Sequence, residues 1–164
     1  MQDLLENVAK ALTDKKLKVA VAESCTGGLV ASALTHRGGS SEFFDCGFIT
    51  YSNQSKIELL HVPEQMLTMN GAVSAQVAEA MARGALKRSG RADIALSITG
   101  VAGPGGGTAA KPVGMVFIGY AQKSGLAGSV ELALKGSREQ IRGLAVAEAL
   151  QQLLKLASRT KANA

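Results

Sequence analysis

A short segment near the amino terminus combines residue types that can carry out acyl-transfer chemistry. In the sequence ESCTGG, residues 23–28, a carboxylate, two hydroxyls and a thiol follow an apolar run and precede two glycines and a helical pattern. Paired glycines let the backbone approach a ligand, and the first turn of a helix offers free N–H groups that suit a phosphate or a developing oxyanion. The segment therefore predicts an anion cradle, in which Ser24 and Thr26 either cap the helix or supply a nucleophile.

A lysine further along the chain is the candidate base for such a nucleophile. If residues 53–62 form a helix, Lys56 lies in its first turn, where the helix dipole penalises a cation and lowers its pKa. An exposed surface lysine is the alternative interpretation, and Tyr51 is either a hydrogen-bonding partner or an edge residue. The only histidines are His36 and His61, so a serine-histidine-acid triad and a metal site both lack support. A serine-lysine pair needs neither histidine nor metal.

A glycine-rich loop, residues 100–114, follows an apolar run that ends near Ile98. The loop has no Walker A sequence, because Lys111 is neither preceded by glycine nor followed by serine or threonine, and it has no GxGxxG. The sequence therefore lacks the motifs that are typical of ATP hydrolysis and of dinucleotide binding, and no cofactor is expected. The loop is either a plain turn or a flexible segment that wraps a ligand next to Thr99.

The elements that must position these loops alternate between helix and strand. Apolar periodicity predicts a helix at the amino terminus, strand 18–24, helix 27–37, strand 45–52, helix 53–62, a turn of helix within 63–74, helix 75–90, strands 92–100, 114–122 and 128–136, and helix 137–158. Because the last two strands resemble a hairpin, the sheet must be mixed. The predicted fold class is α/β, a three-layer helix-sheet-helix sandwich with its ligand crevice beyond the carboxyl ends of the strands.

Composition limits the class of protein. The chain has 164 residues, of which 46% are hydrophobic and 19% charged, so we expect a single domain over residues 1–164. No apolar run is long enough to cross a bilayer and no signal peptide is evident, which favours the cytoplasm and free thiols at Cys25 and Cys46. The net charge of +5 is spread along the chain and aromatic residues make up only 4%, which favours a small phosphorylated ligand over a polynucleotide.

Four segments in one order, residues 22–56, 70–74, 97–114 and 136–142, resemble the C-terminal-domain family of the competence-damage-inducible protein CinA. Members of this family hydrolyse the carboxamide of nicotinamide mononucleotide to nicotinic acid mononucleotide and ammonia. The resemblance implies the same activity here, in pyridine nucleotide salvage, and a stand-alone amidohydrolase domain. In many relatives a larger amino-terminal domain comes first, and its activities are not carried over.

The resemblance also implies roles for individual residues. By match to the family patterns ESCTGG and TYSNxxK, Ser24 is the nucleophile, Lys56 its general base and Tyr51 an assisting residue. Backbone N–H groups of residues 26–28 are then expected to hold the oxyanion, and an arginine fork to hold the phosphate. The expected substrate-binding residues are Thr26, Gly27, Gly28, Thr99, Gly100, Gly103, Arg138 and Arg142.

Two other interpretations stay open. Cys25 adjoins Ser24 and is chemically the better nucleophile, so a cysteine-dependent amidase is one rival, unless the cysteine only packs beneath the turn. The other rival is a noncatalytic nucleotide-binding or regulatory module linked to competence or DNA repair. We also expect a homodimer, because small α/β domains with apolar helices commonly pair.

Overall fold

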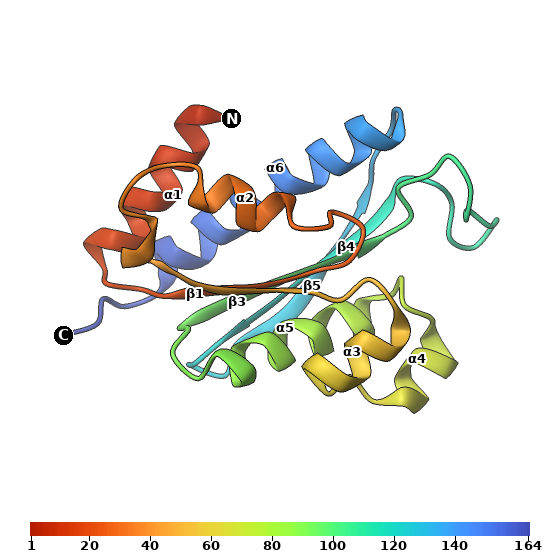
Figure 1. Ribbon diagram of the computed structural model, residues 1–164, viewed down its shortest axis with the longest axis horizontal. Coiled ribbons are helices and arrows are strands. Elements are labelled where there is room, and N and C mark those ends of the chain that lie inside the picture. Colours follow the sequence, from red (N-terminus) through yellow and green to blue (C-terminus); the bar gives the residue numbers. More distant parts are fainter.

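A five-stranded sheet forms the middle layer of the protein, which the computed structural model describes over residues 1–164 (Figure 1). Its strands are β1 (Val19–Glu23), β2 (Phe44–Ile49), β3 (Ile94–Gly100), β4 (Met115–Gln122) and β5 (Ala127–Ala133). They lie in the order β2-β1-β3-β4-β5. Strand β1 runs parallel to both β2 and β3, whereas β4 is antiparallel to β3 and to β5. The predicted mixed sheet is confirmed.

Helices cover both faces of this sheet (Figure 1). One face carries α1 (Gln2–Asp14), α2 (Leu29–Thr35) and α6 (Arg138–Arg159), with a 3-10 turn at Ser40–Glu42. The other face carries α3 (Asn53–Leu60), α4 (Glu64–Asn70) and α5 (Ala75–Ser89). The predicted three-layer helix-sheet-helix sandwich is therefore confirmed. None of these helices has the length and apolar character needed to span a membrane.

The central strand β1 is buried along its whole length and divides the core in two. Val19 and Val21 belong to the apolar cluster beneath α1, α2 and α6, while Ala20 and Ala22 belong to the cluster beneath α5. Alternating side chains of a strand point to opposite faces, so a strand covered on both sides reads as one apolar run. The run ends at Glu23, which is 0% exposed. A buried carboxylate at this position must find hydrogen-bond donors.

Some element boundaries differ from the prediction. Helix α2 begins at Leu29 rather than at the glycines before it, because both glycines have positive φ, 57° and 101°. Strand β2 ends at Ile49, earlier than predicted, because the chain turns and the Ser52 side chain caps α3. Helix α4 is a complete helix where only a turn was expected. The order of the helices and strands along the chain is as predicted.

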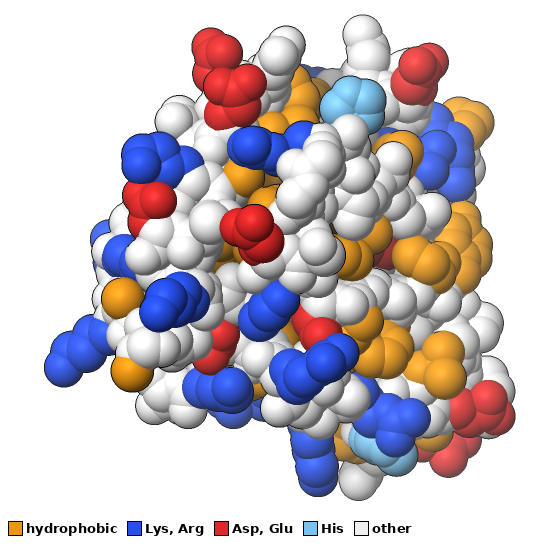
Figure 2. Space-filling view, turned by 60° about the vertical axis from the view of Figure 1, so that its left-hand side comes forward, with side chains coloured by type: hydrophobic (Ala, Val, Ile, Leu, Met, Phe, Trp, Pro, Cys, Tyr) orange, Lys and Arg blue, Asp and Glu red, His pale blue; other side chains and the backbone are white.

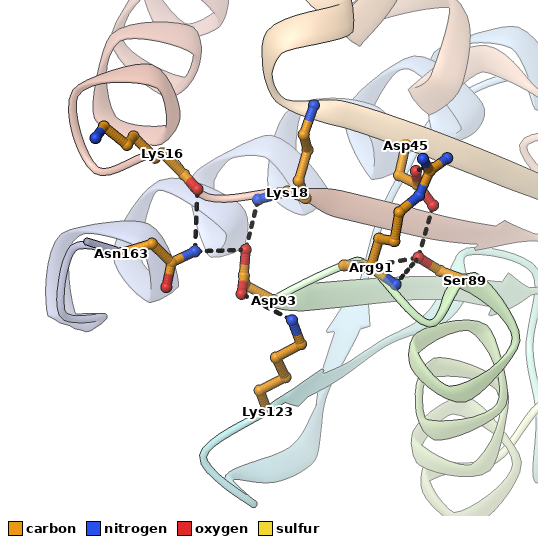
Figure 3. A network of polar contacts seen from close by, with 9 residues as sticks. Lys16, Lys18, Asp45, Ser89, Arg91, Asp93, Lys123 and Asn163 are labelled. Atoms are coloured by element: carbon orange, nitrogen blue, oxygen red, sulfur yellow. Dashed lines mark hydrogen bonds and ion pairs between the residues drawn. The ribbon is translucent and has the colours of Figure 1, made fainter.

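At the amino-terminal ends of β1 and β3, a buried carboxylate joins segments that are far apart in the sequence (Figure 3). Asp93 accepts hydrogen bonds from the backbone N–H of Lys18 at 2.8 Å, the side-chain amide of Asn163 at 3.1 Å and the ammonium of Lys123 at 3.3 Å. The carboxy-terminal tail and the β4–β5 hairpin are thereby attached to the two central strands. This network lies at the end of the sheet opposite to the predicted ligand crevice.

Replacing Asp93 with alanine should destabilise the fold without reducing any activity at the opposite end of the sheet. The substitution removes the acceptor of the Lys18 N–H, and an unsatisfied partly buried donor costs about 1–3 kcal/mol. We expect the free energy of unfolding, measured by urea denaturation, to fall by roughly 2 kcal/mol. The control Lys10→Ala breaks only an exposed pair with Asp14 and should change that free energy by less than about 0.5 kcal/mol. Equal losses in the two variants would contradict this account of the network.

Candidate active site

The carboxyl ends of β1, β2 and β3 bring two of the predicted loops and the start of the third to one edge of the sheet. Glu23 at the end of β1 lies in register with Ile49 of β2 and with Ile98 of β3. The chain directly after these strands is also joined, since the Ser24 N–H donates to the Ile98 carbonyl at 2.9 Å and the Thr50 N–H donates to the Glu23 carbonyl at 2.8 Å. Ser24 therefore lies at the centre of this edge, as the parallel strand order predicts.

Ser24 and Lys56 are within hydrogen-bond distance, although 32 residues separate them in the sequence. The Lys56 Nζ lies 3.1 Å from the Ser24 Oγ, 2.6 Å from the carbonyl oxygen of Thr50 and 3.3 Å from that of Tyr51. A neutral amine has two N–H donors and one lone pair. As the ammonium, Lys56 Nζ donates to both carbonyls and to the Ser24 Oγ. In the neutral form the two carbonyl oxygens can take both donors, which leaves the lone pair for the Ser24 hydroxyl. This is the arrangement that a general base requires.

The environment of Lys56 shifts its ionisation towards the neutral form. The side chain is 0% exposed and forms no ion pair with a carboxylate. Burial lowers the pKa of Lys56 from 10.5 to about 8, because the charged ammonium loses its hydration. The lowered pKa agrees with the prediction, and burial is its main cause. At pH 7 about one Lys56 side chain in ten is then neutral.

Burial shifts the pKa of the neighbouring Cys25 thiol in the opposite direction. Cys25 is 7% exposed and belongs to the apolar cluster beneath α2 and α6. Burial raises the pKa of the Cys25 thiol to about 11, so at neutral pH the reactive thiolate is scarce. Both Cys25 and Cys46 are free thiols, as predicted. The geometry favours Ser24 over Cys25 as the nucleophile.

The anion cradle expected at the start of α2 is filled by the protein's own carboxylate. Glu23 accepts hydrogen bonds from the backbone N–H groups of Gly28 at 3.0 Å, Val30 at 3.1 Å and Ala31 at 2.8 Å. The N–H of Gly27 donates to the Ser24 carbonyl at 3.1 Å. Neither glycine N–H is free, so the expectation that these two groups hold an oxyanion is corrected. Their positive φ values instead let the chain turn sharply into α2.

Arg142, on α6, braces the turn that carries Ser24. Its Nε donates to the Cys25 carbonyl and its Nη2 to the Thr26 carbonyl, both at 3.1 Å. Arg142, the expected phosphate ligand, therefore already holds the backbone next to Ser24. The N–H groups of Cys25 and Thr26 donate to no other residue. They are the backbone donors next to Ser24 that no other residue occupies, and they replace the glycines as candidates for an oxyanion hole.

A second arginine of α6 lies at the rim of the site. Arg138 donates to the Gly103 carbonyl at 2.8 Å and to the Tyr51 hydroxyl at 3.2 Å. The Tyr51 side chain is 63% exposed, and its hydroxyl forms no hydrogen bond with Ser24 or Lys56. Tyr51 contacts Lys56 through its carbonyl only. Through these two hydrogen bonds, Arg138 of α6 connects the glycine-rich loop with the segment before α3.

Two further predicted binding residues, Thr99 and Gly100, make contacts within the fold. Thr99 is 1% exposed, and its hydroxyl donates to the Ala72 carbonyl at 2.8 Å. Its single hydroxyl proton is not free for a ribose or a carboxamide. At Gly100 a Cβ atom would lie 2.7 Å from a methyl carbon of Val116, so glycine is needed there for close packing of β3 on β4. Both residues thus have a role within the fold, and their substrate-binding roles stay predictions.

The Ser24–Lys56 pair identifies this site more clearly than the shape of the surface does. A hollow of about 520 Å³ lies between α1 and α2, and one of about 600 Å³ lies beside it, and neither is lined by Ser24 or Lys56. On the face shown in Figure 2, Lys and Arg side chains are spread among Asp and Glu side chains. No group of three or more His, Cys, Asp or Glu side chains is arranged to hold a metal ion.

Comparisons with known proteins agree on one family. Residues 1–157 match the family described as CinA C-terminal domain. A Caldicellulosiruptor bescii protein named as a competence-damage inducible protein is 54% identical over 154 residues, which cover 94% of this chain and 37% of that protein. The chain thus spans just over a third of that relative. The nicotinamide-nucleotide amidohydrolase PncC of Enterobacter agglomerans is 47% identical over 155 residues, which cover 94% of both chains.

The fold is also similar to solved structures. The crystal structure of the competence/damage inducible protein CihA from Agrobacterium tumefaciens superposes with a TM-score of 0.92 at 45% identity and covers 94% of both chains. The Escherichia coli protein of the competence-damaged protein (CinA) superfamily has a TM-score of 0.89 at 38% identity, over 94% of this chain and 88% of that one. The sheet and helices described above are therefore the fold of this superfamily.

Replacing Glu23 with glutamine should destabilise the protein, although the two side chains have the same shape. Glutamine has one acceptor oxygen, so its NH₂ group would face at least one of the three backbone N–H groups of α2. An unsatisfied buried donor costs about 1–3 kcal/mol, and we expect the free energy of unfolding in urea to fall by that amount. Glu6→Gln on the exposed face of α1 is the matched control, with an expected change within about 0.5 kcal/mol. If Glu23→Gln were as stable as this control, the carboxylate cap would not hold the turn.

Proposed function

The chain belongs to the CinA C-terminal domain family, and we propose that it hydrolyses the carboxamide of nicotinamide mononucleotide, giving nicotinic acid mononucleotide and ammonia. The observation that carries the proposal is the 3.1 Å contact between the Ser24 hydroxyl and the buried Lys56 amine. Support for the substrate comes from the name of the amidohydrolase that matches over 94% of its length. Such a reaction belongs to pyridine nucleotide salvage, and we place it in the cytoplasm.

In the acylation half of the proposed mechanism, neutral Lys56 accepts the Ser24 proton as the Ser24 oxygen attacks the carboxamide carbon. Negative charge then develops on the carbonyl oxygen, where the N–H groups of Cys25 and Thr26 stabilise it. The Lys56 ammonium returns the proton to the leaving nitrogen. The C–N bond breaks, ammonia departs, and the acyl group stays on Ser24.

In the deacylation half, the same amine acts on water. Lys56 is neutral again once ammonia has left, so it can take a proton from a water molecule that attacks the acyl carbon. The same N–H groups stabilise the second oxyanion. Collapse of this intermediate breaks the ester bond, returns a proton to Ser24 and releases the carboxylate product. Both halves use one base, so no histidine is required.

The residues at the rim provide the proposed binding of the nucleotide. Arg138 is exposed and uses two of its five N–H donors, on Gly103 and Tyr51, so the remaining donors are available for the phosphate. The backbone of the glycine-rich loop lies against this arginine. Tyr51 assists in two ways, since its hydroxyl holds Arg138 and its carbonyl holds Lys56. We assign Arg142 to bracing the Ser24 turn.

Substitution of the proposed nucleophile and base should separate the serine mechanism from its cysteine rival. Ser24→Ala and Lys56→Met should each lower ammonia release from nicotinamide mononucleotide by roughly 10³-fold or more, because each removes an atom that takes part in bond making. Cys25→Ala removes only a protonated thiol and should keep turnover within roughly tenfold of the wild type. Full activity in Ser24→Ala would end the serine proposal. Binding of the nucleotide without turnover by the wild type would favour a noncatalytic module.

The pH dependence of turnover tests the state of Lys56. Only the neutral amine accepts a proton, and the lysine loses its charge as the pH rises. We therefore expect kcat/KM to rise about tenfold per pH unit below pH 8 and to level off above an apparent pKa of about 8. The measurement is ammonia release between pH 6 and pH 10, with buffers of constant ionic strength. A rate that is flat or falls between pH 7 and pH 9 would show that this amine is not the base.

A further inference from the structure

Two hydroxyl groups close to the Ser24–Lys56 pair in the sequence have no hydrogen-bond partner. The oxygens Thr26 Oγ1 and Thr50 Oγ1 are the only buried side-chain nitrogen or oxygen atoms of the chain in this condition. Both residues are 0% exposed. Most buried polar atoms in proteins are paired, and an unpaired one destabilises the fold. Two such atoms flanking one site therefore call for a partner that the free chain does not supply.

The backbone holds both threonines beside the reacting groups. The Thr50 carbonyl accepts from the Lys56 Nζ at 2.6 Å, and the Thr50 N–H donates to the backbone carbonyl of Glu23 at 2.8 Å. The Thr26 carbonyl accepts from Arg142 at 3.1 Å, and its own N–H is one of the two free donors of the Ser24 turn. Only rotation about χ1 is left to each side chain, and β-branched residues are restricted there. Each hydroxyl is therefore confined to the surroundings of its own backbone.

We propose that Thr26 and Thr50 bind the reacting carboxamide through their side-chain hydroxyls, an assignment that rests on the proposed amidohydrolase function. Thr26 lies in the oxyanion turn, so its hydroxyl donates to the carbonyl oxygen as a third donor. Thr50 holds the Lys56 amine, so its hydroxyl accepts an N–H of the carboxamide. That contact directs the leaving nitrogen to the ammonium that must protonate it. Both hydroxyls gain their partners only when the substrate is bound.

The two roles predict different substrate dependence. A carboxamide and a methyl ester share the carbonyl oxygen, but only the carboxamide has an N–H to donate. Loss of the Thr26 hydroxyl should therefore weaken hydrolysis of both substrates. Loss of the Thr50 hydroxyl should weaken hydrolysis of the amide alone. A threonine that merely supports the fold would affect both substrates alike through loss of folded protein.

The experiment compares Thr26→Val and Thr50→Val, which keep the side-chain shape, on nicotinamide mononucleotide and on the methyl ester of nicotinic acid mononucleotide. We expect Thr26→Val to lower kcat/KM about 10- to 100-fold for both substrates. We expect Thr50→Val to lower it about tenfold for the amide and less than about threefold for the ester. Thr26→Ser and Thr50→Ser keep the hydroxyl and should restore most of the wild-type value.

Stability of the free protein gives a second readout that does not depend on turnover. Neither valine variant loses a hydrogen bond of the free chain, so their melting temperatures should equal or exceed that of the wild type. The matched control is Ser97→Ala, whose buried hydroxyl donates to the Ala78 carbonyl at 2.5 Å; its melting temperature should fall while kcat/KM stays unchanged.

Two results would overturn the assignment. The first is a fall in melting temperature for both valine variants as large as that of Ser97→Ala, since the hydroxyls would then have partners inside the protein. The second is unchanged kcat/KM for both substrates in both variants while the wild type turns over. Absence of turnover in the wild type would instead refute the amidohydrolase function itself, so the two failures are distinguishable.

Discussion

A lysine side chain that is wholly buried without a carboxylate partner is the constraint on which this site depends. Its ammonium form loses hydration, so the pKa of Lys56 falls to about 8, and two backbone carbonyls hold its N–H groups while Ser24 lies at 3.1 Å. Those carbonyls come from the turn between β2 and α3. The turn is fixed by the parallel pairing of β1 with β2 and by the cap at Ser52. A change in that register would move the Lys56 amine away from the Ser24 hydroxyl.

The buried carboxylate of Glu23 affects the chemistry of the Ser24 and Cys25 side chains in the turn. A free helix N-terminus beside Cys25 would stabilise a thiolate. Glu23 takes that N-terminus with three hydrogen bonds, and the pKa of Cys25 is raised chiefly by burial, with the negative charge of Glu23 acting in the same direction. In the proposed mechanism the oxyanion donors are therefore the N–H groups between Ser24 and the glycines. Glu23, a carboxylate that is unusual at the end of a buried strand, thus supports the turn.

Sequence patterns predicted the layers, the mixed sheet and the meeting of the loops that carry Ser24 and Lys56, because these follow from strand periodicity and from the rule that parallel strands end at one edge. The pairing of the two side chains was implied by the family resemblance, and their contact at 3.1 Å agrees with it. The patterns could not predict that the Glu23 carboxylate caps α2. Its oxygens reach the N–H groups there only because the two glycines before the helix have positive φ. Nor could they show that Arg142 reaches the Cys25 carbonyl, 117 residues away, instead of a phosphate. Contacts of that kind depend on how α6 packs on α2. Oligomeric state and domain extent stay predictions.

The groups at the two ends of β1 have opposite effects on the stability of the fold. At the carboxyl end, a desolvated amine and two unpaired hydroxyls each oppose folding. At the amino end, the oxygens of Asp93 are saturated by donors from the chain before β1, the β4–β5 hairpin and the carboxy-terminal tail. Active sites commonly retain groups that a stability optimum would remove, and the remainder of the fold must offset them. Here the strand that spans both ends is five residues long, so the groups that prepare the chemistry and the groups that hold the sheet act on the same short segment.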